Sequence, residues 1–141
     1  MKESVLITGG AGYLGSVLAE VLLDNGYNVT VFDNLMYKQT SLLHLCNIDG
    51  FKFIKGDVTN KKQFLPQIIN HNIIIPLAAI VGAPACDANK DLATAINYTQ
   101  IQFIVDNLEP TQKLIMPNTN SQYGSSTEVI TEDSPFNPLS H

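Results

Sequence analysis

Four closely spaced glycines near the N-terminus give the chain its clearest chemical signal. The stretch TGGAGYLG, from Thr8 to Gly15, contains GxGxxG through Gly10, Gly12 and Gly15, and GxxGxxG through Gly9, Gly12 and Gly15. Either spacing permits a sharp backbone turn, and the missing Cβ atoms let a pyrophosphate approach the main chain. The N–H groups and the dipole at the start of a following helix would then hold the anion.

A carboxylate follows at the distance that a dinucleotide site requires. Asp33 ends the apolar stretch NVTVFD, about 20 residues after Gly12, where a carboxylate accepts hydrogen bonds from an adenosine ribose. A carboxylate repels a 2′-phosphate, and the stretch DNLMYK offers Lys38 but no arginine beside it. The pattern therefore predicts NAD as the cofactor and disfavours NADP. The alternative is that the glycines form a plain connector and that Asp33 is a solvated residue at a strand end.

Strand-like and helix-like segments alternate along the chain and would position these residues. Short apolar runs predict strands at 4–8, 28–33, 51–54, 72–79 and 113–117, and helices are expected from residue 14 and near 60–70 and 90–108. Pro66 weakens the second helix, and Pro76 is tolerable only near a strand end. This alternation predicts an α/β fold, namely a Rossmann-type doubly wound parallel sheet of about five strands with flanking helices.

The first of these helices shows a regular apolar stripe. Its members recur at the spacing of one helical face, and Asn25-Gly26 provides the C-terminal stop; the stripe consists of Leu14, Val17, Leu18, Val21 and Leu22. We expect this stripe to pack on the sheet.

Composition excludes several other classes of protein. The 141 residues match one domain, 1–141, and the net charge of −5 provides no basic surface for nucleic acid. No apolar stretch approaches the roughly 18 residues of a membrane span, so no membrane partner and a cytoplasmic location are expected. Cys46 and Cys86 have no CxxC or CxxH neighbours, and no metal site is predicted.

In these features the sequence resembles the extended short-chain dehydrogenase/reductase family, which includes the NAD-dependent nucleotide-sugar epimerases and dehydratases. The resemblance covers the whole chain. It rests on five landmarks in order, which are TGGAGYLG, VFDNL, GDV, PLAA followed by INYT, and TNSQYG followed by TEDSPFNP. It implies that this chain is the NAD-binding part of an enzyme that moves hydride between a sugar carbon and NAD.

The resemblance also implies a role for individual residues. The glycine loop would bind the pyrophosphate, and Asp33 would hold the adenosine ribose. Asp57 and Val58 would lie against the adenine, Leu77, Ala78 and Ala79 would form the wall behind the cofactor, and Asn97 would support the active-site end. The full set of cofactor-binding residues that it implies is Gly9, Gly12, Tyr13, Leu14, Gly15, Asp33, Asn34, Asp57, Val58, Leu77, Ala78, Ala79 and Asn97.

Thr119 is the candidate catalytic residue, again by resemblance. Counted back from Tyr123, it occupies the position of the hydroxyl that hydrogen-bonds the substrate oxygen undergoing oxidation, and a hydroxyl can both donate and accept. In the similar nucleotide-sugar dehydratases, the two positions that follow this hydroxyl residue look like Asp-Glu, the acid and base of water elimination. This chain has Asn120 and Ser121 there. A dehydratase is therefore disfavoured against an epimerase, a reductase or a related sugar-modifying enzyme. The alternative is that Thr119 is a strand-end hydroxyl that caps a turn.

The family's proton-transfer pair is the point where the resemblance stops. Its catalytic tyrosine and lysine form a YxxxK motif shortly after a segment like TEDSPFNPLSH, so the tyrosine would follow His141. Tyr123 is a poor substitute, because the residue four positions later is Thr127. We expect the chain to be a truncated N-terminal part of a longer enzyme and inactive by itself.

The segment 90–108 predicts an assembly surface. Ile101, Ile104, Val105 and Leu108 would form one apolar face of this helix, with Leu92, Ile96 and Phe103 roughly opposite. One face should pack on the sheet. The resemblance implies that the other face meets the YxxxK helix of the longer enzyme and a partner subunit, so we expect a homodimer or self-association through it. The resemblance also implies a nucleotide-sugar as substrate of the longer enzyme. The competing hypothesis is a non-catalytic dinucleotide-binding or interaction module.

Overall fold

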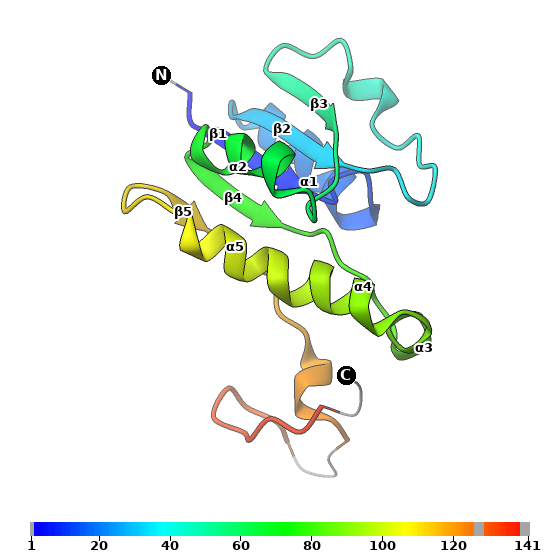
Figure 1. The fold of residues 1–141 in the computed structure, drawn as a ribbon. Coiled ribbons are helices and arrows are strands. Elements are labelled where there is room, and N and C mark those ends of the chain that lie inside the picture. Colours follow the sequence, from blue (N-terminus) through cyan, green and yellow to red (C-terminus); the bar gives the residue numbers. More distant parts are fainter. Residues whose placement is uncertain (1, 126–128, 139–141) are drawn as a thin grey trace.

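A computed structural model describes residues 2–125 and 129–138 of the protein, and it confirms the predicted fold class. Five parallel strands form one sheet in the order β3-β2-β1-β4-β5 (Figure 1). Their bounds are Ser4–Thr8 (β1), Asn28–Asp33 (β2), Phe51–Lys55 (β3), Ile73–Pro76 (β4) and Lys113–Leu114 (β5). The chain builds outward from β1 to β3 and then returns to pair β4 with β1, which places a topological switch point between β1 and β4.

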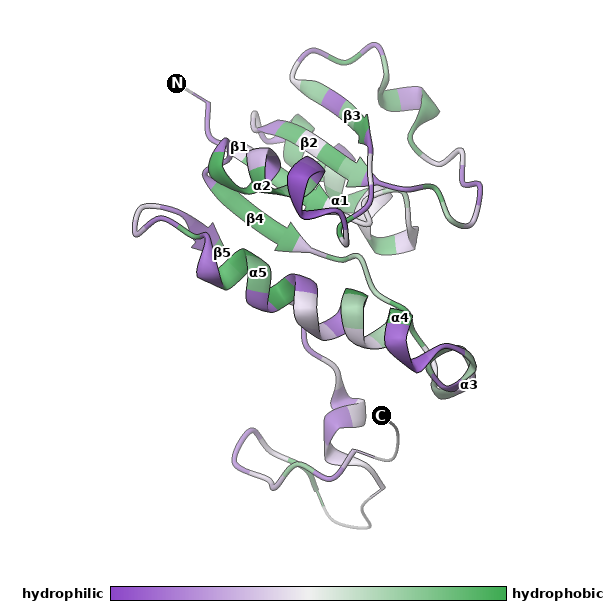
Figure 2. Ribbon diagram, viewed as in Figure 1, coloured by the Kyte–Doolittle hydropathy of each residue, from purple (hydrophilic) through white to green (hydrophobic). Residues whose placement is uncertain are grey.

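The central strands are apolar throughout because both faces of the sheet are covered. In β1, Val5 and Ile7 face one core cluster, and Leu6 between them faces the other. Figure 2 shows β1, β2 and β4 as the most hydrophobic ribbons, between helices that are more polar. Near-continuous apolar runs of this kind are typical of buried parallel strands.

Two strands are shorter than the sequence predicted. β4 ends at Pro76 because its neighbour β1 ends at Thr8, and the Thr8 carbonyl accepts its last hydrogen bond from Leu77. β5 spans only Lys113–Leu114, and the last ladder bond is from the Ile115 N–H to the Ile74 carbonyl. Pro76 therefore sits at a strand end, where its missing N–H is tolerated.

Helix α1, Tyr13–Asp24, covers one face of the sheet, but the predicted apolar stripe does not pack as a unit. Gly15 and Ala19 are buried, and Leu18 packs against the core, whereas Leu14 and Val17 are about half exposed. Val21 is likewise half exposed, and Leu22 packs against the core. The small residues allow the helix to approach the sheet closely, so the contact face is centred on them and not on the larger side chains.

Helix α2, Lys61–Ile69, covers the opposite face together with α5 and confirms the predicted helix near 60–70 in spite of Pro66. The side chain of Asn60 caps it by accepting a hydrogen bond from the Gln63 N–H. Phe64 is fully buried and stacks on Phe32 of β2 with ring centroids 5.5 Å apart. Tertiary packing thus offsets the cost of a proline within the helix.

The segment after β4 contains the short helix α3, Ala83–Ala88, followed by a continuous helical rod. Asn89, with extended backbone angles, separates the two, and the rod comprises α4, Lys90–Thr94, a π-helical turn at Ala95–Thr99, and α5, Gln100–Asp106. The prediction of two opposite apolar faces here is wrong. Ala93, Ile96, Gln100 and Ile104 are all buried and form a single face toward the sheet, and Leu92, Ile101, Phe103 and Leu108 pack against the same core cluster.

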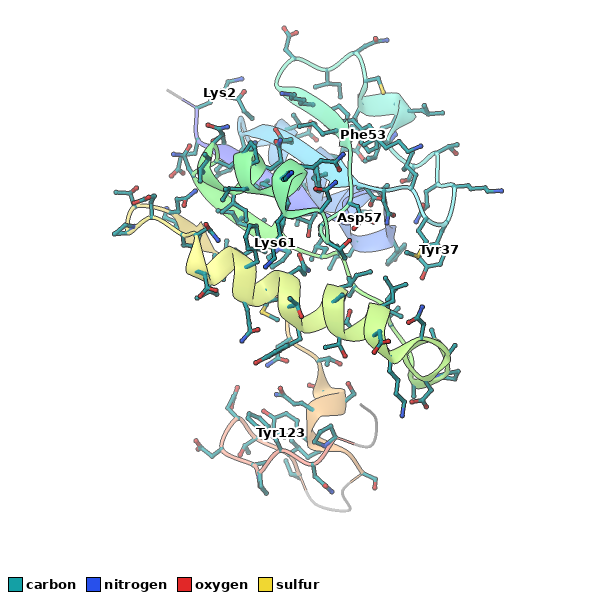
Figure 3. All side chains as sticks on the ribbon, viewed as in Figure 1. Lys2, Tyr37, Phe53, Asp57, Lys61 and Tyr123 are labelled. Carbon is teal, nitrogen blue, oxygen red and sulfur yellow. The ribbon has the colours of Figure 1, made fainter. Side chains whose placement is uncertain are left out.

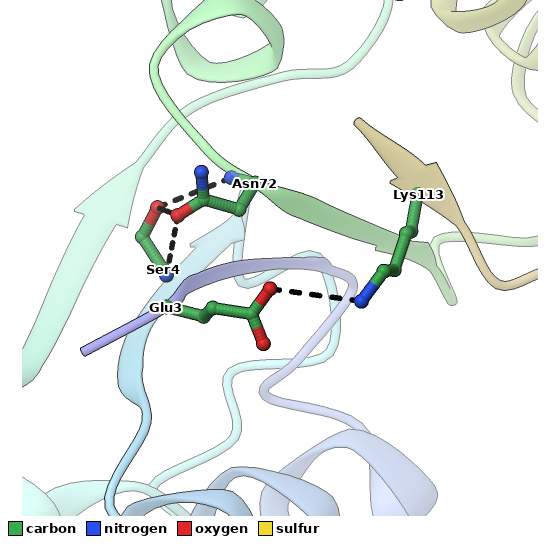
Figure 4. A network of polar contacts seen from close by, with 4 residues as sticks. All are labelled: Glu3, Ser4, Asn72 and Lys113. Carbon is green, nitrogen blue, oxygen red and sulfur yellow. Dashed lines mark hydrogen bonds and ion pairs between the residues drawn. The ribbon is translucent and has the colours of Figure 1, made fainter. Parts of the chain in front are cut away.

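The two ends of the sheet have different characters. At the amino ends of β1 and β4, the Asn72 Oδ1 accepts from the Ser4 N–H and hydroxyl, both at 2.9 Å, and Ser4 Oγ accepts from the Asn72 N–H (Figure 4). Glu3 and Lys113 add an exposed ion pair of 3.6 Å beside this contact. The carboxyl ends of the strands, at the opposite end of the sheet, carry the glycine loop and Asp33. The candidate site residues therefore lie at that end.

The last described segment lies away from the sheet (Figure 1). It contains a short 3-10 turn, Asn120–Tyr123, and the rings of Tyr123 and Phe136 pack with centroids 5.7 Å apart. The Asn137 N–H donates to the Gln122 carbonyl and holds the two limbs of this segment together. The segment after β5 is therefore held together by contacts between its own residues.

Candidate functional site

The glycine loop crosses the carboxyl end of the sheet as a tightly packed turn. Gly9 adopts φ +66°, and a Cβ there would lie 2.6 Å from the Ala78 backbone. A Cβ on Gly15 would lie 2.5 Å from the Gly10 Cα, so Gly15 permits close contact between α1 and the loop. At Gly12 the nearest atom to an added Cβ is the Gly9 carbonyl oxygen at 3.2 Å. The turn thus requires small residues for two different reasons, namely backbone angle and close approach.

The first turn of α1 provides main-chain donors beside this loop. Gly12 is the N-cap, and no side chain caps the helix. The Ser16 N–H donates to the Gly12 carbonyl, whereas helix geometry leaves the N–H groups of Tyr13, Leu14 and Gly15 without intrahelical acceptors. These groups and the helix dipole are suited to an anion.

Asp33 is the buried carboxylate of the site and ties the loops together. Its Oδ2 accepts from the Ala11 N–H at 3.0 Å, and its Oδ1 accepts from the Leu35 N–H at 2.7 Å. The carboxylate therefore fixes the glycine loop against the end of β2. Each oxygen keeps lone-pair capacity for a further donor.

The segment after β4 forms a rigid wall opposite Asp33. Thr8 Oγ1 accepts from the Ala78 N–H, and Gln100 Nε2 donates to the Ala78 carbonyl at 3.0 Å. Asn97, in the π-helical turn, binds both main-chain groups of Ile80 at 2.8 Å, accepting from its N–H and donating to its carbonyl. π-Helical turns often occur at functional sites. This one places the Asn97 side chain against the backbone of Ile80 in this wall.

Asn34 and Asp57 meet at a third corner of the site. Burial raises the pKa of Asp57, but hydrogen bonds from the Thr59 hydroxyl and N–H and from the Asn34 side chain outweigh it and leave the pKa below its usual value of 3.8. The Thr59 contacts to Asp57 Oδ1 are 2.7 and 2.8 Å. Figure 3 shows Asp57 and Tyr37 at the sheet end of the molecule, far from Tyr123.

These corners enclose a cleft of about 430 Å³ at the switch point between β1 and β4. Its lining is mostly apolar, and no Lys, Arg or His is among the described residues that form it. Ten of the predicted cofactor-binding residues line it, namely Gly9, Gly12, Tyr13, Leu14, Asp33, Asn34, Val58, Leu77, Ala78 and Ala79.

The remaining predicted residues lie outside the cleft lining. Gly15 packs closely against Gly10 of the glycine loop. Asn97 hydrogen-bonds the main chain of Ile80, and Asp57 accepts a hydrogen bond from Asn34; both Ile80 and Asn34 line the cleft. Thr119 is exposed in the C-terminal segment, where its Oγ1 accepts from the Ser121 N–H at 3.3 Å and caps the short turn. Thr127, the residue four positions after Tyr123, and His141 are not among the described residues.

Several lining residues were not anticipated from the sequence. They are Phe32, Met36, Tyr37, Gln39, Gly56, Ile80, Val81 and Ile96. Gly56 had a readable signal in the GDV landmark, since a Cβ there would lie 2.2 Å from the Phe32 ring. For the others no spacing pattern exists, because long-range folding brings them to the cleft.

Within 2–125 and 129–138, no helix is both long and apolar enough to cross a membrane. The same residues contain no group of three or more His, Cys, Asp or Glu side chains that could hold a metal ion.

Comparison with known families agrees with this geometry. The family model described as NAD dependent epimerase/dehydratase family matches residues 5–141. The chain belongs to this family. Membership confirms the resemblance inferred from the glycine, Asp33 and TNSQYG landmarks.

Members of the epimerase/dehydratase family with known activities are similar over nearly all of this chain. UDP-N-acetyl-alpha-D-glucosaminuronate decarboxylase of Bacillus cytotoxicus is 32% identical over 94% of the chain and 41% of its own length. UDP-glucose 4-epimerase of Mycolicibacterium smegmatis is 30% identical over 96% of the chain and 45% of its own length.

A solved family structure supports the same relationship. UDP-glucuronic acid 4-epimerase of Bacillus cereus, in complex with UDP-glucuronic acid and NAD, superposes with a TM-score of 0.87 at 26% identity. The superposition covers 97% of this chain and 46% of the epimerase. The chain thus spans less than half the length of each of these three relatives.

The Asp57 corner predicts a pH-dependent effect. The lowered pKa means that this carboxylate stabilises the fold when it is ionised, and that the contribution is lost as pH falls below 3.8 through the folded-state pKa. Thr59→Val removes one hydrogen bond to the ionised form. We expect it to lower the free energy of unfolding at pH 7, and the deficit to shrink in acid, as measured by urea unfolding between pH 7 and pH 3. A deficit independent of pH would contradict this assignment, and Thr40→Val, in another exposed loop, is the control.

Proposed function

We propose that residues 1–141 form an NAD-binding Rossmann domain of a nucleotide-sugar epimerase or a related sugar-modifying enzyme of this family. The observation that carries the proposal is the cleft at the switch point, which combines the glycine loop, the donors of α1 and the Asp33 carboxylate. NAD is bound in the B. cereus relative. The parent reaction would oxidise a sugar hydroxyl carbon by hydride transfer to NAD.

The residues of the cleft suit a dinucleotide. The N–H groups of Tyr13 and Leu14 would hold the pyrophosphate, because Gly12 leaves the main chain open and no cation lines the cleft. Asp33 would accept from the adenosine ribose hydroxyls with its remaining lone pairs. Asn34 and Val58 would border the adenine, and Leu77, Ala78 and Ala79 would exclude water on the other side. NAD, when bound, supplies the hydride acceptor.

Proton transfer needs groups that the described cleft does not contain. A tyrosine acts as base near neutral pH when a lysine and a positive cofactor ring lower its pKa. Tyr13 and Tyr37 line the cleft without any lysine beside them in that lining. We propose that the tyrosine and lysine of a YxxxK motif, supplied from outside these residues, move the proton, and that the 141 residues alone do not catalyse. Asn120 and Ser121 disfavour a dehydratase.

Cofactor binding tests the proposal directly. We expect the 141-residue protein to bind NAD detectably by isothermal titration calorimetry, more tightly than NADP. Asp33→Asn keeps one acceptor oxygen for a main-chain N–H but removes the charge, so NAD affinity should fall about tenfold, the loss of one charge-assisted hydrogen bond. The ratio of NAD affinity to NADP affinity should be smaller in Asp33→Asn than in the unmodified protein.

Asp49→Asn, an exposed carboxylate outside the cleft, is the matched control. Absence of heat and of thermal stabilisation at millimolar NAD for the unmodified protein would contradict the proposed function.

A second candidate is a non-catalytic dinucleotide-binding or interaction module. The position of Thr119 favours it, because that hydroxyl is exposed and engaged in capping. Thr119→Val separates the two candidates. In an enzyme that carries these residues with the YxxxK pair, we expect turnover to fall more than tenfold with little change in cofactor affinity, because the hydrogen bond that orients the reacting oxygen is lost. Thr119→Ser should retain turnover. A module would show no change in any activity.

The helical rod provides a candidate assembly surface. Tyr98 and Val105 are 59% and 54% exposed, and Met116 is 55% exposed; with Asn97, Ile101, Gln102 and Asp106 they line a shallow groove of about 290 Å³. Exposed apolar surface of this kind is typical of interaction sites. We propose that this groove mediates a homodimer or self-association.

Sedimentation tests the assembly. We expect association at micromolar concentration, and we expect Val105→Glu to shift the protein toward monomer because it introduces a charge into the groove. Val17→Glu, at an equally exposed apolar position on α1, should leave the association unchanged. A monodisperse monomer of the unmodified protein would contradict the proposal.

A further inference from the structure

Gln100, at the start of α5, is a buried amide with one satisfied end and one unsatisfied end. The residue lies on the face of the rod toward the sheet and is only 3% exposed. Its Nε2 donates to the Ala78 carbonyl at 3.0 Å, whereas its Oε1 is buried with no hydrogen-bond partner in the described part of the chain. An unpaired buried acceptor costs folding free energy, which an apolar side chain of the same length would avoid. Stability of the fold alone therefore does not explain a glutamine at this position.

The hydrogen bond that Gln100 makes lies where the wall of the cleft meets the glycine loop. Gly9 packs directly on Ala78, because a Cβ on Gly9 would lie 2.6 Å from the Ala78 Cα and nitrogen. Thr8 Oγ1 accepts from the Ala78 N–H at 3.3 Å. Ala78 is thus held from β1 at its N–H and from the rod at its carbonyl, and its position sets the spacing between the wall and the glycine loop.

The rod binds this wall at two alternate carbonyls. Asn97 Nδ2 donates to the Ile80 carbonyl at 2.8 Å, and Gln100, three residues later, donates to the carbonyl of Ala78. Residues three apart lie on one face of a helix, so the end of the π-helical turn presents both amides to the same segment. Neither amide residue is among the described residues that line the cleft, whereas Ala78 and Ile80 both line it. Gln100 therefore acts on the cleft through the backbone of the wall.

The corner around Asp33 is held independently of the rod. The Asp33 carboxylate accepts from the N–H groups of Ala11 and Leu35, and Asn34 donates to Asp57. None of these hydrogen bonds involves a residue of the rod. A change in the wall should therefore leave this corner intact and affect only the part of a ligand that extends beyond it.

We propose that Gln100 is a positioning residue for the dinucleotide, and that its amide holds Ala78 at the spacing that admits the nicotinamide half of NAD. The inference rests on the proposed function. When the Ala78 carbonyl is released, the wall can adopt several positions, and NAD must select one of them on binding. The adenosine half, bound at the Asp33 corner, does not depend on this selection.

Calorimetric titration of the 141-residue protein with NAD and with AMP tests this role. Gln100→Met retains the length of the side chain and removes both the donor to Ala78 and the unpaired Oε1. We expect NAD affinity to fall about tenfold, the entropic effect of ordering roughly one backbone residue on binding, and AMP affinity to stay within about twofold. The thermal unfolding midpoint should stay within about 4 °C, because the lost hydrogen bond and the removal of the unpaired acceptor offset each other. Gln67→Met, the same replacement on α2 outside the cleft, should change neither affinity.

Each of the other outcomes contradicts the inference. Unchanged NAD affinity in Gln100→Met would overturn it and leave the proposed function intact. Parallel losses for NAD and AMP, or a fall in the unfolding midpoint larger than the one stated, would also overturn it, since Gln100 would then only stabilise the fold. If Gln100→Met does not fold by circular dichroism, Gln100→Asn, which withdraws the donor by one methylene, is titrated for the same selective loss of NAD. If the unmodified protein binds neither NAD nor AMP, the proposed function and the inference fail together.

Discussion

The carboxylate of Asp33 is the constraint on which the site depends. Its two oxygens bind the N–H of Ala11 in the glycine loop and the N–H of Leu35 in the next loop, so one buried side chain sets the distance between them. Both donors belong to the main chain, so the tie joins the two loops without a further side chain. Hydrogen bonds from the Gly9 N–H to the Phe32 carbonyl and from the Ser41 hydroxyl to the Ala11 carbonyl hold the same turn from either side of this carboxylate.

The opposite wall is built by a different kind of contact. Ala78 and Ile80 have no polar side chains of their own, and their main-chain groups are bound by Thr8, Asn97 and Gln100 from neighbouring elements. The buried thiol of Cys86 also donates to the Ile80 carbonyl, at 3.4 Å. An apolar wall of small residues can therefore stay rigid beside an open cleft, since its backbone is satisfied from behind.

The cleft and Thr119, the candidate catalytic residue, lie apart in the described part of this chain. The described cleft has the features needed to hold a dinucleotide without any cation, while Thr119 stands in a segment beyond the sheet. Family membership gives the chemical context, namely enzymes that act on nucleotide sugars over chains more than twice as long. This separation is common in Rossmann proteins, where the fold binds the cofactor and residues from other segments determine the reaction.

The sequence by itself determined the fold class and ten of the residues that line the candidate cleft. Periodicity placed β1 and β2 at their observed bounds, and local turn chemistry identified Gly9, Gly12 and Asp33, because such signals depend on neighbours in the chain. Only the tertiary structure decided which helix faces are buried. It centred the contact of α1 on Gly15 and Ala19, and it placed Ile96 and Ile104 on one face. It also brought Gln39 and Val81 into the lining of the cleft, because contacts between distant segments follow from packing and no sequence period records them.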